Sequence, residues 1–346
     1  MTKTRIYRVD ELDKPSAQTN IKKTLQQGKN VVFPTETVYG IGANALSKEG
    51  IENIYKIKGR PSDNPLIMHL ANADDLDKYV YVNQPYIKKL IHAFWPGPLT
   101  MVFEKKTSVP DYFTGGLKTV GVRIPGSAIA RKIIEIADVP ICAPSANISG
   151  RPSSTLFKHV IEDFNQKADI LIDGGKSEVG LESTVLDVTK PVPVILRPGM
   201  ITYDMIKTIT GSVHISSDTL DDDIPKSPGM KYKHYAPKGQ LIIVEGDIDK
   251  VIEYINKHTV AHQKSGYKTG VITTSEYKDQ FTSSYIYNIG WSTNESEIAS
   301  NIFAALRDMD EKDIEFIYTL SFRNGQYSDA IMNRLIKAAN KHIINV

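Results

Sequence analysis

Cysteine is almost missing from this chain of 346 residues, and the single one, Cys142, lies in the apolar run VPICAP. A lone cysteine excludes an internal disulfide and any zinc site built from several cysteines. We therefore expect Cys142 to be a small buried hydrophobe rather than a nucleophile.

Long apolar runs are missing as well. No stretch approaches the length of about 20 residues that crosses a bilayer, and residues 1–15 lack the apolar centre of a signal peptide. The sequence therefore predicts a cytoplasmic protein without membrane contact.

Charge of one sign is also scarce, since the net charge is only +2. Residues 1–211 carry 27 Lys and Arg against 22 Asp and Glu, a balance of +5, and residues 240–346 carry 11 against 14, a balance of −3. Stable binding of nucleic acid relies on many phosphate contacts, so this excess argues against it. A small phosphorylated ligand at the first part of the chain fits the balance better.

Strand-like runs dominate residues 1–211. They are rich in β-branched residues and bounded by Gly or Pro, and they span residues 31–34, 65–70, 99–104, 119–125, 139–144, 170–173, 183–188 and 192–198. Helical patterns are fewer and span residues 21–27, 49–57, 83–94 and 128–137. An excess of strands over helices predicts an α/β domain with a mixed, twisted sheet.

The rest of the chain divides into two parts. Residues 212–239 have almost no apolar periodicity, so we expect a linker, and its aromatic and basic end SPGMKYKHYAP suits stacking and phosphate contact as well as a solvated stretch. Residues 240–346 alternate strands and helices, which predicts a smaller Rossmann-like domain with a parallel sheet in three layers. This domain has no GxGxxG motif and no catalytic constellation; Arg323 and Asn324 follow its last predicted strand, where an ordinary loop is the simpler interpretation.

The most informative motif is Lys58-Gly59-Arg60, which follows a predicted helix and leads into PSDNP. On an extended segment, residues i and i+2 point the same way, so Lys58 and Arg60 could bind one polyphosphate together. The alternative is that both cations complement the dipole of the preceding helix.

Three further segments place polar side chains near apolar strands. Thr37 lies in PTETVYG, which on its own suits a β-turn, and His69 lies in an apolar strand, where a satisfied core histidine is common. Arg123 alternates with Thr119 and Gly121 on one strand face and needs an anion, either a structural carboxylate or a substrate carboxylate. Ends of α/β strands are where ligands usually bind.

Together these segments resemble the threonylcarbamoyl-AMP synthase family, whose catalytic module is the YrdC-like domain. The family signature, Lys-x-Arg followed by Ser-x-Asn, is matched by Lys58, Arg60, Ser145 and Asn147. Also similar, in order, are PTETVYG, KGRPSDNPL, WPGPLT, VGVRIP, APSANISG, ESTV, LRPG and SPGMKYKHYAP. The C-terminal part resembles the long branch of the family, which implies a YrdC-like domain over 1–211, a linker over 212–239 that closes over the active site, and a Rossmann-like domain over 240–346.

The resemblance implies an enzyme, a nucleotidyltransferase that joins L-threonine, bicarbonate or CO2, and ATP into threonylcarbamoyl-AMP and releases pyrophosphate. Its product would pass to downstream proteins that modify tRNA. Implied catalytic residues are Lys58 and Arg60. Implied L-threonine contacts are Thr37, His69, Arg123, Ala143 and Ser183. Implied ATP contacts are Lys58, Arg60, Asn64, Thr119, Ser145, Asn147, Ser153, Arg197, His234 and Tyr235.

The chemistry of this reaction needs no side-chain nucleophile, because the carbamate of threonine attacks the α-phosphorus of ATP. Cations near the leaving pyrophosphate and exclusion of water would suffice. We expect Mg²⁺ on the phosphates, with protein ligands unknown. Two alternatives are an RNA-binding module without catalysis and a carbamoyl-transferring relative with the same module.

Overall fold

The computed structural model describes residues 3–62, 64–216 and 234–346. Its contacts divide the chain into two compact units, which we describe separately. The first unit comprises Met1–Ser149, Ser154–Glu178 and Glu182–Lys231, and the second comprises Gly150–Ser153, Val179–Leu181 and Tyr232–Val346. The boundaries at 211 and 240 stay a prediction, and residues 217–233 of the expected linker lie outside the described residues.

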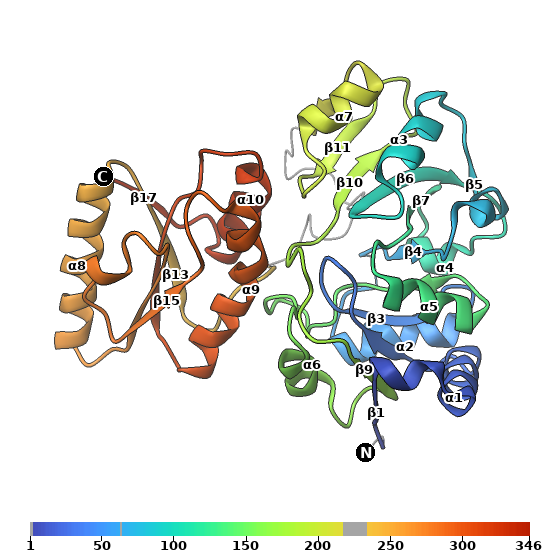
Figure 1. Cartoon of the computed structure of the whole chain (residues 1–346), viewed down its shortest axis with the longest axis horizontal. Helices are drawn as coiled ribbons and strands as arrows, with labels where there is room; N and C mark the ends of the chain where they lie inside the picture. Colours follow the sequence, from blue (N-terminus) through green and yellow to red (C-terminus); the bar gives the residue numbers. More distant parts are fainter. Residues whose placement is uncertain (1–2, 63, 217–233) are drawn as a thin grey trace. The chain divides into compact units, whose positions relative to one another are not determined.

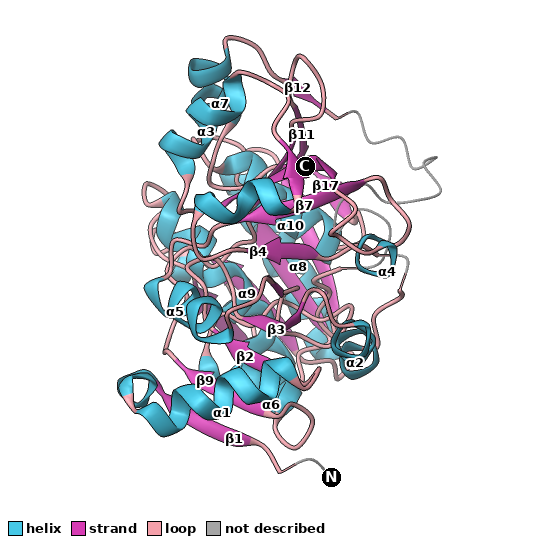
Figure 2. Ribbon diagram, turned by 90° about the vertical axis from the view of Figure 1, so that its right-hand side faces the viewer, coloured by secondary structure: helices cyan, strands magenta, loops and turns pink. Residues whose placement is uncertain are grey.

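The first unit is built on one large mixed sheet. Its described strands are β1 (Arg5–Arg8), β2 (Val31–Phe33), β3 (Gly40–Asn44), β4 (Ile67–His69), β5 (Val80–Tyr81), β6 (Leu99–Lys105), β7 (Thr119–Arg123), β8 (Ile141–Cys142), β9 (Ile170–Asp173), β10 (Thr184–Asp187), β11 (Val194–Arg197) and β12 (His214–Ile215). They pair in the order β1-β9-β2-β3-β8-β4-β7-β6-β10-β11-β12, with β5 beside β6. Both parallel and antiparallel pairs occur along this path, which confirms the predicted mixed sheet (Figure 2).

The helices of the first unit are amphipathic segments between these strands. They are α1 (Pro15–Gln26), α2 (Lys48–Lys58), α3 (Tyr86–Phe94), α4 (Asp111–Thr114), α5 (Ala128–Ala137), α6 (Phe157–Phe164) and α7 (Tyr203–Thr210), with short 3-10 turns η1 (Val9–Asp13) and η2 (Ala73–Lys78). Serine side chains cap two of them: Ser47 accepts from Gly50 N before α2, and Ser127 accepts from Ala130 N before α5. The predicted bounds of α5 are confirmed.

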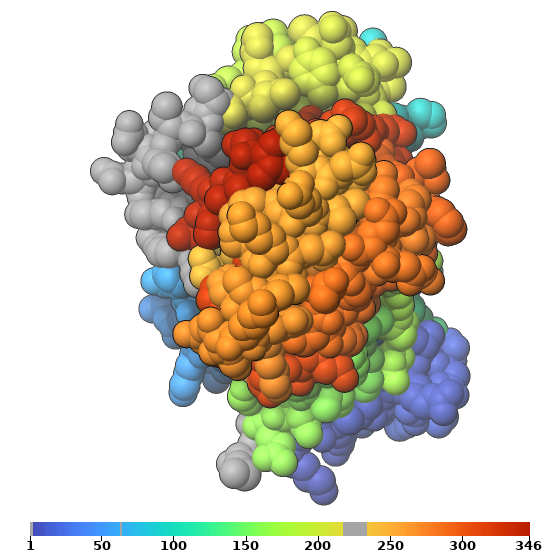
Figure 3. Space-filling model, turned by 90° about the vertical axis from the view of Figure 1, so that its left-hand side faces the viewer, coloured from blue at the N-terminus to red at the C-terminus, as the bar shows by residue number. Residues whose placement is uncertain are grey.

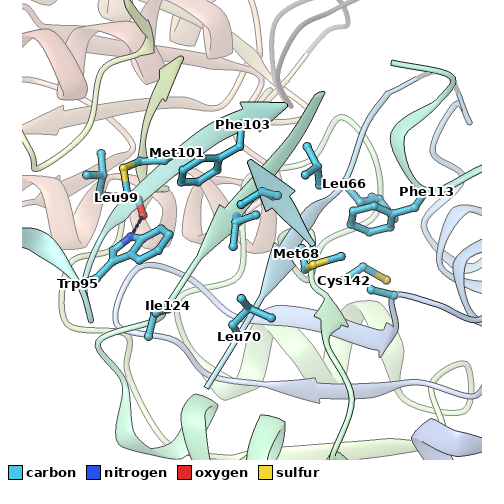
Figure 4. Close-up of a cluster of buried hydrophobic side chains, with 14 of the residues drawn as sticks. Leu66, Met68, Leu70, Trp95, Leu99, Met101, Phe103, Phe113, Ile124 and Cys142 are labelled. Atoms are coloured by element: carbon cyan, nitrogen blue, oxygen red, sulfur yellow. Dashed lines mark hydrogen bonds between the residues drawn. The ribbon is translucent and has the colours of Figure 1, made fainter. Parts of the chain in front are cut away.

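The core of the first unit lies on one face of the central strands. Along β4, β7 and β6, every second side chain enters a buried apolar cluster that contains Met68, Val122, Met101 and Phe103 (Figure 4). Trp95 closes this cluster and donates from Nε1 to the carbonyl of Leu99 at 2.7 Å. Because side chains alternate along a strand, the intervening residues point to the opposite face of the sheet.

The second unit has the predicted regular architecture. Its elements are β13 (Gln240–Glu245), α8 (Ile248–Lys264), β14 (Thr269–Thr273), η3 (Lys278–Gln280), β15 (Tyr285–Asn288), α9 (Glu295–Glu311), β16 (Phe316–Leu320), α10 (Ser328–Ala338) and β17 (Ile343–Asn345). All strand pairs are parallel, in the order β15-β14-β16-β13-β17. Helix α8 covers one face of the sheet and α9 and α10 cover the other, so the expected three layers are confirmed (Figure 1).

Eight of the described strands and α-helices were not expected from the sequence: β1, β3, β5, β12, β17, α4, α6 and α7. Strand β3 is the clearest case, because its sequence GIGAN contains one β-branched residue and two glycines. It is a strand because β2 and β8 flank it on both sides. A Cβ at Gly42 would lie 2.6 Å from Phe33 Cε1, so this close packing requires glycine.

Among the helices that the structure describes, none combines the length and the hydropathy that a membrane crossing needs.

We predict that Phe103→Ala lowers the free energy of unfolding by about 3–5 kcal/mol, because Phe103 is fully buried and its removal leaves a cavity. Denaturant unfolding followed by circular dichroism measures the change. Leu46→Ala is the control, since Leu46 is an exposed turn residue, and we expect its effect to stay within about 0.5 kcal/mol. Equal losses in both variants would contradict the assignment of the core.

Candidate active site

Helix α2 ends at Lys58, and this residue turns inward rather than toward solvent. Lys58 is 1% exposed, and its Nζ donates to the carbonyl of Ser145 at 2.5 Å and to that of Asn147 at 2.6 Å. Gly59, in the left-handed region at φ 60°, then turns the chain before Arg60. The prediction that Lys58 and Arg60 share an extended segment is therefore wrong, because Lys58 belongs to the helix.

The Ser145–Asn147 turn is held by its own side chains as well. Ser145 Oγ donates to Asn147 Oδ1 at 2.6 Å, and Asn147 Nδ2 donates to the carbonyl of Ile148 at 2.9 Å. The backbone N–H of Ser149 donates to the carbonyl of Lys58 at 2.9 Å. The two halves of the signature thus meet in space, with Lys58 as the link between them.

Arg60 lies beyond the glycine on the segment that leads into β4. It is half-buried, and its Nη2 donates to the carbonyl of Pro65 at 3.1 Å, with Nε 3.4 Å from the carbonyl of Asn64. Asn64 is 2% exposed, and its Oδ1 accepts no hydrogen bond within the described residues. A buried acceptor without a partner is costly, so a ligand that donates to Asn64 would remove this penalty.

A small hollow lies on the sheet face opposite the core. Pairing places Gly121 beside Ile67 of β4 and Val102 of β6, so these residues share that face. The hollow is lined among others by Pro65, Ile67, Thr119 and Gly121. It encloses only about 10 Å³, room for about one water, so a nucleotide bound there would extend beyond it.

Arg123, at the end of β7, occupies the same face and is buried with three partners. Its Nη2 lies 2.7 Å from Glu36 Oε1, its Nη1 donates to Thr37 Oγ1 at 2.9 Å, and its Nε donates to the carbonyl of Gly97 at 3.2 Å. Nε and Nη1 thus donate hydrogen bonds, and Nη2 makes the ion pair. Glu36 is therefore the structural carboxylate that the sequence left as one of two possibilities.

Glu36 was missed from the sequence, although it stands next to Thr37. Its carboxylate also accepts from Gly126 N at 2.7 Å and from Ser127 N at 3.2 Å. Burial by itself would raise the pKa of Glu36, but the Arg123 charge and these N–H groups outweigh it and hold the pKa below its ordinary value. Two observations in the sequence could have indicated this pair: Arg123 needs an anion, and Glu36 is the only acid in PTETVYG.

His69 lies beside Arg123, since these two residues pair across β4 and β7. It is 3% exposed, and its Nδ1 lies 3.2 Å from the carbonyl of Ile67. Burial, and after it the positive charge of Arg123, lowers the pKa of His69 to about 3. The imidazole is therefore neutral at physiological pH.

The remaining predicted residues of the first unit lie on neighbouring strands. Ser183 Oγ is 2.8 Å from Thr100 Oγ1 and accepts from Arg197 Nη2 at 3.2 Å. Arg197 Nε also donates to the carbonyl of Ser183 at 3.1 Å. Ala143 is buried next to β4, and its N–H donates to the carbonyl of Ile67 at 3.2 Å.

Ser153, His234 and Tyr235 belong to the second unit, so we describe them separately. Ser153 is fully buried. Tyr235 is buried as well, with its ring centroid 5.1 Å from that of Phe303 and 5.5 Å from that of His234. Within the part of the chain that the structure describes, no group of three or more His, Cys, Asp or Glu side chains could hold a metal ion.

Two family models together match almost the whole chain. The model described as "Telomere recombination" matches residues 23–199, and the model described as "Threonylcarbamoyl-AMP synthase, C-terminal domain" matches residues 201–340. The threonylcarbamoyl-AMP synthase of Pyrococcus abyssi is 44% identical over 93% of this chain and 94% of its own length. That of Bacillus subtilis is 40% identical over 92% of both chains.

This chain belongs to the threonylcarbamoyl-AMP synthase family.

A solved structure of the family supports the same fold. The crystal structure of P. abyssi Sua5 complexed with L-threonine matches with a TM-score of 0.91 and 40% identity, covering 99% of each chain. The threonylcarbamoyl-AMP synthase fold is therefore shown for both units of this family member.

We predict that His69 makes the stability of this synthase family member depend on pH. The effect should begin below about pH 6.5, the ordinary pKa of a histidine side chain. Below that pH the His69 imidazole is protonated in the unfolded chain but stays neutral in the folded chain, because its pKa is lowered there. The free energy of unfolding therefore falls by up to about 1.4 kcal/mol per pH unit as the pH drops. Urea unfolding between about pH 7 and 5 measures it. This part of the slope should vanish in His69→Gln and persist in His92→Gln, since His92 is exposed on α3; an unchanged slope in His69→Gln would refute it.

We also predict strong coupling between Glu36 and Arg123. Either Glu36→Gln or Arg123→Ala leaves a buried charge without its partner and lowers the free energy of unfolding by about 3–5 kcal/mol. The double variant should lose clearly less than the sum, as denaturant unfolding would show. The exposed pair Lys22 and Asp138 is the control, with an expected coupling below about 1 kcal/mol. Additive losses at Glu36 and Arg123 would argue against the ion pair.

Proposed function

We propose that this chain condenses L-threonine, bicarbonate or CO2, and ATP to threonylcarbamoyl-AMP, with release of pyrophosphate. The observation that carries the proposal is the contact of Lys58 with Ser145 and Asn147, which joins the two halves of the family signature. The similarity to a structure complexed with L-threonine supports it.

L-Threonine is assigned to the pocket around Arg123. A guanidinium carries five N–H donors, and the hydrogen bonds of Arg123 to Gly97 and Thr37 leave donors that suit the substrate carboxylate. Neutral His69 adds no charge that would repel the amino group, and the Arg123 and Glu36 charges balance each other. A zwitterion fits such a site. The proposed threonine contacts remain Thr37, His69, Arg123, Ala143 and Ser183.

ATP is assigned to the hollow and its rim. Thr119 lines the hollow, and Asn64 offers its buried Oδ1 to a donor. Arg60 is the proposed direct contact to the phosphates. Lys58 acts on the nucleotide by holding the turn beneath it, which revises its expected role. Lys58 is therefore a positioning residue, and the proposed nucleotide contacts are Arg60, Asn64, Thr119, Ser145, Asn147, Ser153, Arg197, His234 and Tyr235.

The reaction then runs through the substrates rather than through a protein nucleophile. Threonine and bicarbonate give a carbamate and water; a carbamate oxygen bonds to the α-phosphorus, and the bond to pyrophosphate breaks. Burial raises the pKa of the Cys142 thiol to about 12, so this thiol is inert. Mg²⁺ would enter with the substrate, held by the ATP phosphates. The protein contributes orientation and positive charge.

The proposal extends to the fate of the product. The enzyme class would be a nucleotidyltransferase, and threonylcarbamoyl-AMP would pass to proteins that modify tRNA. Cytoplasmic location and closure by residues 212–239 belong to the same proposal; residues 217–233 of that segment lie outside the described residues.

The test is pyrophosphate release by the purified full chain. We expect release only when ATP, L-threonine and bicarbonate are all present. Arg60→Ala should lower the rate by about 100-fold or more, the usual effect of removing a group that stabilises transition-state charge. Lys56→Ala is the matched control, because Lys56 is an exposed cation in the last turn of α2, four residues before Arg60. We expect this variant to release pyrophosphate at the unchanged rate.

Release that is indifferent to threonine would overturn the proposed reaction. Equal losses of the rate of pyrophosphate release in Arg60→Ala and Lys56→Ala would contradict a specific role of Arg60. They would instead support the alternative that both cations only complement the dipole of α2.

A further inference from the structure

The second unit contains a crevice that is lined by none of the residues proposed for the synthase site. Strand β13 leads through α8 to β14 on one side, and its neighbour β16 leads through α10 to β17 on the other. The two helices lie on opposite faces of the sheet (Figure 1). Where connections diverge in this way, the carboxyl ends of the two strands leave a crevice in which α/β proteins bind ligands.

A hollow of about 300 Å³ lies at these strand ends. Its apolar floor includes Val244, Ile298, Leu320 and Phe322. That volume is at the lower end of ligand pockets, so it suits a small metabolite rather than a dinucleotide. Figure 3 views the second unit from the side of α8, which forms the front of the picture.

Arg323 provides the positive charge of this hollow. Its Nε lies 2.7 Å from Glu245 Oε1, and its side chain is 52% exposed. Within the described residues the contact to Glu245 engages Nε alone, so the two terminal nitrogens can bind a carboxylate. The N-terminus of α10 adds to this preference, because Ile331 of α10 lines the hollow and Tyr327 at the N-cap makes no side-chain cap hydrogen bond.

Glu295, the first residue of α9, provides a negative charge in the same hollow. Its Oε2 accepts from Tyr327 N at 3.1 Å. The loop after β16 packs closely against this carboxylate. A Cβ at Gly325, where φ is 147°, would lie 2.1 Å from Glu295 Oε1, so this close contact requires glycine. Thr274 lines the hollow too and is 1% exposed.

These charges select among small ligands. A phosphate would meet Glu295 and Glu245, and a simple amine would meet Arg323. A zwitterion presents one charge of each sign, and an apolar body fits the floor. We propose that the second unit binds a free α-amino acid with an apolar side chain, its carboxylate on Arg323 and its ammonium on Glu295. This site shares no residue with the proposed threonine pocket of the first unit.

The test uses the full chain without ATP and three related probes. L-Leucine carries both charges, 3-methylbutylamine lacks the carboxylate, and 4-methylpentanoate lacks the ammonium. We expect saturable leucine binding by calorimetry, with both analogues weaker by at least about tenfold. Leucine should also change the fluorescence of Trp291, which is 56% exposed beside the pocket residue Ser292; Trp291→Phe should remove this signal and keep the calorimetric binding.

Two variants separate the charges. Arg323→Gln should weaken leucine by at least about tenfold and leave 3-methylbutylamine unchanged, and Glu295→Gln should weaken leucine equally and leave 4-methylpentanoate unchanged. Glu253→Gln, an exposed acid on α8, is the matched control and should bind leucine normally. Circular dichroism confirms that each variant is folded.

Three results would overturn the proposal: no saturable leucine binding by the folded chain, leucine binding unchanged in both variants, or inorganic phosphate binding more tightly than leucine and being lost in Arg323→Gln. None of them bears on pyrophosphate release, so the synthase proposal is tested separately.

Discussion

The ammonium of Lys58 ties together two segments that are almost ninety residues apart, and the site is built around this contact. A buried charge is tolerated only when hydrogen bonds replace its water, and here the carbonyls of Ser145 and Asn147 do so. Those carbonyls can converge on one nitrogen only if the turn keeps its conformation. The contact therefore holds the end of α2 and the turn after β8 in one arrangement.

Charge is otherwise balanced on this face of the sheet. Glu36 neutralises Arg123, and burial beside Arg123 keeps His69 uncharged. Together these three residues therefore give this face of the sheet no net charge.

The sequence predicted elements whose pattern is local. Strands β6 and β7 have apolar or alternating apolar side chains over five or more residues, and α5 has a serine cap and an apolar stripe. These local patterns were enough to predict their positions, which the structure confirms. Strand β3 could not be predicted, because GIGAN becomes a strand only between β2 and β8. The partner of Arg123 and the inward turn of Lys58 were missed for the same reason: both depend on contacts between residues more than eighty positions apart.

Strand β1 also bears on how the chain folds during synthesis. Arg5 pairs with Ile170, so this strand has no partner until the chain is half made. At translation rates of about 5–20 residues per second, roughly 8–30 seconds separate the two strands. An unpaired strand invites association with other chains, and charge is a common protection. The exposed side chains of Arg5 and Arg8 give the waiting strand that protection, so the same residues that look dispensable in the finished sheet guard the nascent chain.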